Sequence, residues 1–76
     1  MPHVIVELYS GRPDREKSRL AGEITKAVMT ALNYGEESVS VGIEDVKPAD
    51  WTEKVFRPDI LDKAETIYKK PGYDPT

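Results

Sequence analysis

The chain has 76 residues, enough for one small domain with little apolar surface to bury. It contains no cysteine and a single histidine, so disulfide bonds are excluded and neither a thiolate metal site nor a structural zinc site is expected. Eleven basic and fourteen acidic residues give a net charge of −3, which argues against a surface for nucleic acids or for anionic membranes. A domain this small usually needs a disulfide, a metal or a partner subunit, and the partner subunit is the option that remains.

No apolar run approaches the 18 residues of a transmembrane helix, and no signal-peptide pattern is present. We find no internal repeat and no composition typical of a linker. We therefore expect residues 1–76 to form one domain of a cytoplasmic protein.

The first half of the chain predicts a strand followed by a long helix. Residues 4–9 alternate with a period of two and include several β-branched side chains, which is typical of a strand. A turn at residues 10–14 follows, and Pro13 with the acidic residues after it fits the start of a helix. One helical stripe then carries Leu20, Ile24, Ala27, Val28, Ala31 and Leu32. Residues 33–35 are typical of a helix C-terminus.

The second half predicts another strand and another helix. Residues 39–44 alternate as the first strand does, and residues 47–50 form a turn. Apolar residues at helical spacing over 55–68 predict a second helix, which Pro58 either kinks or divides. Two lysines and a Pro-Gly pair at 69–72 fit the C-terminus of that helix.

These elements predict an α/β fold made of a βαβ unit with a C-terminal helix. A strand, a long helix and a second strand imply parallel strands joined by a right-handed crossover. Two strands alone leave sheet edges unpaired and one face of the sheet open. Association of sheets between subunits would remove both defects, so composition and topology both favour a homo-oligomer.

The N-terminus is a candidate catalytic site because Pro2 follows the initiating methionine. Removal of Met1 would expose a secondary amine. An α-amino group titrates near ~8, and burial or nearby cations lower that pKa. Such an amine could act as a neutral general base near pH 7. The simpler interpretation is an initiator methionine followed by the start of a strand.

Further residues strengthen the catalytic interpretation. After Pro2 and the first strand come Gly11-Arg12, an acidic helix start, the segment Ser38-Val39-Ser40-Val41, and Trp51 after a turn. This pattern resembles the 4-oxalocrotonate tautomerase family, whose members are small βαβ chains that use an amino-terminal proline as base. The C-terminal Lys70-Pro71-Gly72-Tyr73 is most similar to a bacterial branch with a longer second helix, whose members are more often homodimers than hexamers.

The resemblance implies a role for each matching position. Pro2 corresponds to the catalytic base, Arg12 to an arginine that binds the substrate carboxylate, and Trp51 to an aromatic wall of the pocket. The family's second arginine, which polarises the keto oxygen, is replaced by Ser40. A hydroxyl donates one hydrogen bond but supplies no charge. The resemblance therefore favours a simple enol or 2-oxo monocarboxylate over a dicarboxylate as substrate, with Ser40 as a substrate-binding residue.

The resulting hypothesis is a cofactor-independent tautomerase that acts on small carboxylates such as phenylenolpyruvate and forms a homodimer, with a trimer or hexamer as alternatives. Two other functions stay open at this point. One is a non-catalytic oligomeric interaction module, and the other is a proline-dependent hydratase, dehalogenase or decarboxylase of unsaturated acids. His3 is expected at the surface or in an interface, and the four tyrosines do not identify a general acid.

Overall fold

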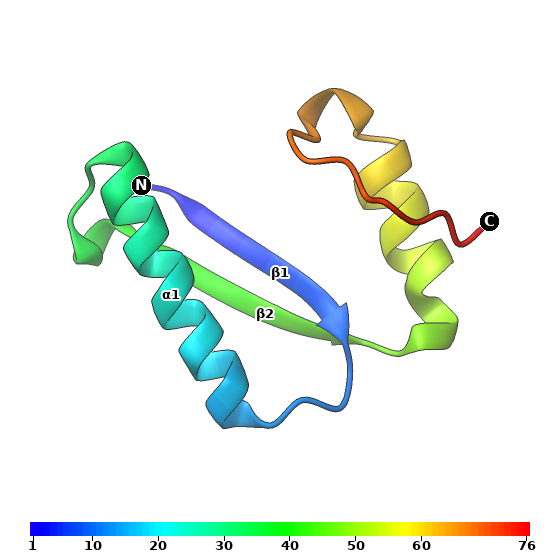
Figure 1. The fold of residues 1–76 in the computed structure, drawn as a ribbon, viewed down its shortest axis with the longest axis horizontal. Coiled ribbons are helices and arrows are strands. Elements are labelled where there is room, and N and C mark those ends of the chain that lie inside the picture. The colour runs from blue at the N-terminus through cyan, green and yellow to red at the C-terminus, as the bar shows by residue number, and fades with distance from the viewer.

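The computed structural model describes residues 1–76 and contains a two-stranded parallel sheet, one long helix and a C-terminal segment of short helices (Figure 1). Strand β1 spans His3–Tyr9 and strand β2 spans Ser40–Val46. In the register of the sheet, His3 lies opposite Ser40 and Tyr9 lies opposite Val46. The predicted parallel βαβ unit is confirmed, although β2 begins one residue later and ends two residues later than expected.

Helix α1 spans Asp14–Leu32 and joins the two strands across one face of the sheet (Figure 1). It begins directly after Pro13 and ends at Asn33, whose left-handed conformation (φ 58°, ψ 45°) closes the helix as the sequence predicted. The Nζ of Lys17 lies 2.6 Å from Oδ2 of Asp45 on β2. This ion pair fixes α1 to the sheet and identifies the face that the helix covers.

Burial alternates along β1 in agreement with that arrangement, except at Glu7, which is half-buried on the other face. The side chains that share the face of Asp45 are half-buried under α1: Val4, Val6 and Leu8. On the other face, Ile5 and Tyr9 are 56% and 52% exposed. A chain with only two strands therefore leaves one face of its sheet largely uncovered.

The C-terminal segment differs from the long helix that the sequence predicts. It contains the π-helix η3, Thr52–Leu61, which continues through Pro58. Proline has no N–H to bond the carbonyl four residues earlier, and the wider turns accommodate this loss. Asp62, for example, donates its N–H to the carbonyl of Arg57 at 2.9 Å. The helix ends at Leu61, so the prediction that it extends to Lys69-Lys70 is wrong.

Three single turns of 3-10 helix complete the secondary structure: η1 (Glu36–Ser38), η2 (Pro48–Asp50) and η4 (Ala64–Thr66). After η4 the chain folds back on η3. Ile67 is extended (φ −86°, ψ 106°), and the ring centroid of Tyr73 comes to 5.8 Å from that of Phe56. The apolar residues after Leu61 that predicted a continuous helix therefore belong to a returning segment, which packs on η3.

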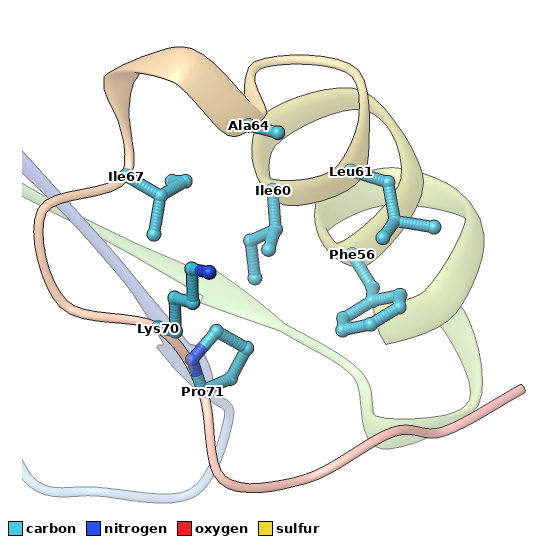
Figure 2. Close-up of a pocket in the computed structure, with 7 residues that line it drawn as sticks. All are labelled: Phe56, Ile60, Leu61, Ala64, Ile67, Lys70 and Pro71. Carbon is cyan, nitrogen blue, oxygen red and sulfur yellow. The ribbon is translucent and has the colours of Figure 1, made fainter.

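The core is small and lies under that returning segment. Val55 and Phe56 are the only residues with less than a tenth of their surface exposed. Figure 2 shows Phe56, Ile60 and Leu61 on η3 facing Ile67 and Pro71 of the returning chain around a hollow of about 260 Å³. None of the helices combines the length and the apolar character that crossing a bilayer requires.

Candidate active site

Pro2 lies at the start of β1, next to the first residue of β2. Its carbonyl oxygen accepts a hydrogen bond from the backbone N–H of Ser40 at 3.2 Å. The Ser40 hydroxyl lies 2.6 Å from Nδ1 of His3, which is opposite it in the sheet. Pro2 is half-buried, while Met1 is 91% exposed. The sheet thus fixes the position of Pro2, and His3, expected at the surface or in an interface, contacts the side chain of Ser40.

Arg12 lies beyond the opposite end of β1, in the turn that leads into α1. Gly11 before it has φ +117°, a backbone conformation that residues with a Cβ rarely adopt. The Arg12 side chain is 67% exposed and its Nη1 lies 3.0 Å from Oε1 of Glu16. An exposed ion pair of this kind is weak, so the guanidinium is available to bind a carboxylate through two hydrogen bonds.

Trp51 lies at the same end of the sheet as Arg12, between η2 and η3. Its indole ring contacts the ring of Tyr9 in an edge-to-face arrangement, with the ring centroids 5.2 Å apart and the ring planes at 80°. Its Nε1 donates a hydrogen bond to the Tyr73 hydroxyl at 3.0 Å. The indole is half-buried and is held between the end of β1 and the C-terminal tail.

One chain does not bring the four predicted residues together. Pro2 and Ser40 are at the amino ends of the strands, whereas Arg12 and Trp51 follow their carboxyl ends. The seven residues of β1 separate the two pairs by about 20 Å, since a strand rises about 3.3 Å per residue. An arginine side chain does not span that distance.

The structure adds a residue that the sequence analysis missed. Glu7 on β1 lines a hollow of about 320 Å³ together with Leu8, Tyr9, Trp51 and Tyr73. Partial burial, the neighbouring carboxyl of Asp59 and the charge of Glu44 raise the pKa of Glu7 to about 7, against the opposing effect of Lys63. A lone carboxylate within a β-branched strand was the available signal, but its partners are far away in the sequence.

The other hollows contain none of the predicted site residues. The hollow of Figure 2 is lined by the C-terminal segment alone, with Lys70 as its charged residue. No three His, Asp or Glu side chains gather in a way that could hold a metal ion. The hollow beside Trp51 is therefore the one that joins a predicted site residue to a titratable group.

Comparison with known proteins identifies the family. A family model described as tautomerase enzyme matches residues 2–55, and this match begins at Pro2. The chain belongs to the tautomerase family. It is 40% identical over 73 residues to a probable tautomerase of Xylella fastidiosa (strain 9a5c), covering 96% of this chain and 89% of that protein. It is 33% identical over 75 residues to tautomerase PptA of Cronobacter sakazakii, covering 97% and 99%.

Solved structures of tautomerase homologues share the fold. TomN, a 4-oxalocrotonate tautomerase homologue in the tomaymycin biosynthetic pathway, superimposes with a TM-score of 0.64 at 32% identity, covering 66% of this chain and 77% of that one. YwhB, another homologue of 4-oxalocrotonate tautomerase, gives 0.59 at 35% identity, covering 60% and 75%. The predicted family and fold class are confirmed. Tautomerases are isomerases, so this tautomerase is an enzyme of that class.

Proposed function

We propose that this tautomerase interconverts the enol and keto forms of small 2-oxo monocarboxylates such as phenylenolpyruvate, with Pro2 as general base after removal of Met1. The observation that carries the proposal is Pro2 itself, at the start of the family match and half-buried at the amino end of the sheet. A secondary amine in a partly desolvated place has a lower pKa and is neutral in a larger fraction of molecules. No cofactor is required for such a proton transfer.

The chemistry needs one proton to leave an oxygen and one to reach a carbon. Arg12 binds the substrate carboxylate, and the Pro2 nitrogen takes the proton of the enol hydroxyl. The electrons of that O–H bond form the C=O double bond, and those of the C=C bond take the proton back from the Pro2 ammonium at the neighbouring carbon. Trp51 forms an apolar wall that keeps water from the enolate, and Ser40 supplies a hydrogen-bond donor.

The separation of these residues within one chain supports a site shared between subunits. A two-fold related second copy, with its sheet running in the opposite direction, brings the amino end of one sheet beside the carboxyl end of the other. Pro2 of one subunit then meets Arg12 and Trp51 of its partner. The same contact would cover apolar side chains that are exposed here, such as Ile5 and Tyr9. We therefore propose a homodimer as the active form.

Replacement of Pro2 tests the proposal. Pro2→Ala is expected to lower kcat/KM for phenylenolpyruvate ketonisation by about 100-fold or more, as the loss of a general base does. Pro75→Ala, in the exposed tail, is the matched control and is expected to keep the full rate. Intact mass spectrometry of both proteins establishes that Met1 has been removed. Activity that survives Pro2→Ala, or that is absent from protein lacking Met1, would contradict the proposed base.

A further inference from the structure

Tyr73 connects the returning segment, residues 67–76, to the aromatic residues at the end of the sheet. Its hydroxyl accepts a hydrogen bond from Nε1 of Trp51 at 3.0 Å. The Tyr73 ring also packs against the ring of Phe56 on η3, with the ring centroids 5.8 Å apart and the ring planes at 46°. Phe56 belongs to the buried core, so its contact fixes the ring of Tyr73 while the hydroxyl reaches the indole.

The indole of Trp51 is restrained from two directions. The ring of Tyr9, at the end of β1, meets it edge to face with the centroids 5.2 Å apart. The indole N–H is the only hydrogen-bonding group of a tryptophan side chain, and here the Tyr73 hydroxyl is its partner. The contact with Tyr9 limits the tilt of the indole plane, and the hydrogen bond sets the direction of Nε1.

The same three aromatic residues line a hollow of about 320 Å³, together with Glu7 and Leu8. An apolar cavity of about 150 Å³ is large enough to bind benzene, so this hollow has room for an aromatic ring. None of its lining residues is a cation, and a substrate carboxylate therefore finds no partner inside it. Arg12 follows Tyr9 by three residues, which places the proposed carboxylate site at the same end of the sheet.

We propose that Tyr73 is a positioning residue that determines specificity: it holds Trp51 in the orientation that, with Tyr9, forms a subsite for the aromatic group of the substrate. The proposal rests on the proposed function in that it takes Arg12 as the carboxylate site. Without the hydrogen bond, the indole is free to rotate toward the hollow and to fill part of it. The family match ends at residue 55, so the returning segment adds this specificity from outside the matched residues.

The indole N–H signal tests the hydrogen bond without any substrate, because Trp51 is the only tryptophan in the chain and gives a single indole resonance in a ¹H–¹⁵N spectrum. Tyr73→Phe removes the hydroxyl and keeps the ring that packs on Phe56. This variant is expected to shift the indole proton signal upfield and to speed its exchange with solvent several-fold. Tyr68→Phe is the matched control, since Tyr68 is 99% exposed, and it should leave the signal unchanged. An indole signal that does not move in Tyr73→Phe would overturn the proposal.

Two 2-oxo acids of different size test the specificity. Enolisation in D₂O replaces the C3 protons of phenylpyruvate and of 2-oxobutanoate with deuterium, and proton NMR follows both reactions. Tyr73→Phe is expected to raise the KM for phenylpyruvate about three- to tenfold, the ratio that the loss of one hydrogen bond produces, with little change in kcat. The kcat/KM for 2-oxobutanoate is expected to stay at the wild-type value, because this substrate has no aromatic group. Equal losses for both substrates would overturn the specificity role.

The Trp51→Phe background tests whether Tyr73 acts through the indole. Tyr73→Phe is expected to cause no further rise in KM there, because the hydrogen bond is already absent. A rise that persists in this background would refute a role through Trp51. A shifted indole signal with a selective rise in KM, together with exchange that survives Pro2→Ala, would support the subsite while refuting the proposed base.

Discussion

A mixture of the Pro2→Ala and Arg12→Ala variants is expected to regain activity that neither variant has alone. Within one chain these residues lie at opposite ends of β1, about 20 Å apart at 3.3 Å per residue, so a site that uses both must combine two subunits. In a mixed dimer, one of the two sites pairs the intact Pro2 of one chain with the intact Arg12 of the other. The second site of that dimer carries both substitutions.

The size of the recovery follows from the statistics of assembly. Equal amounts of two variants that associate at random give half mixed dimers, each with one intact site of two, so the mixture is expected to reach about one quarter of the wild-type rate. A ring of subunits gives the same fraction of intact sites. Each site takes Pro2 from one chain and Arg12 from the neighbouring chain, and each of these residues is intact in half of the chains. The assay is the initial rate of phenylenolpyruvate ketonisation after the variants are unfolded in urea and refolded together.

The control for refolding is a mixture of Pro2→Ala with the double variant Pro2→Ala/Arg12→Ala, in which no combination of subunits contains an intact Pro2. This mixture is expected to stay as inactive as either protein alone. If the first mixture also stays inactive while mass spectrometry shows mixed oligomers, then Pro2 and Arg12 do not act across an interface. That outcome would refute a site shared between subunits.

Two further predictions concern stability. Because the pKa of Glu7 is raised from 4.5 to about 7 on folding, its stabilising effect is complete below pH 4.5 and is lost as the pH rises through 7. At 1.36 kcal/mol per pKa unit the upper bound is about 3 kcal/mol, and solvent screening of a partly exposed carboxyl reduces it to about 1 kcal/mol. Urea unfolding should therefore show a larger loss of stability from pH 5 to pH 8 in the wild type than in Glu7→Gln, and equal losses would contradict the raised pKa. At the end of α1, Asn33→Ala is expected to lower the free energy of unfolding by about 1 kcal/mol and Asn33→Gly to leave it nearly unchanged, since φ 58° disfavours a Cβ; a neutral Asn33→Ala would argue against this cap.

The parts of the fold that depend on local pattern were predictable from the sequence. The period of two in β1, the apolar stripe of α1 and the left-handed Asn33 each reflect interactions within a few residues. The end of η3 at Leu61 was not predictable in the same way. Beyond it the chain reverses, so that Tyr73 packs on Phe56, and a helical spacing of apolar residues does not distinguish a continuing helix from a returning segment.

The site was predictable as a set of residues but not as an arrangement. Pro2, Arg12, Ser40 and Trp51 follow from the family resemblance, and their roles remain predictions. The raised pKa of Glu7 depends on where η3, which carries Asp59, lies relative to the sheet, and no local pattern encodes that position. Likewise, His3 binds Ser40 because the strands pair in one register rather than another.

The substitution of Ser40 for an arginine bears on which substrates the proposed site accepts. Among the residues proposed for the site, Arg12 alone carries a permanent charge, and the Ser40 hydroxyl supplies at most one hydrogen bond. At an effective dielectric constant of 20, a carboxylate about 4 Å from a cation gains about 4 kcal/mol, and a second carboxylate without a partner gains nothing while losing its water. A dicarboxylate would therefore leave one charge uncompensated beside the Trp51 wall. A monocarboxylate with an apolar or aromatic remainder places its charge on Arg12 and its apolar part against the indole, which is why phenylenolpyruvate fits this site better than a dicarboxylate does.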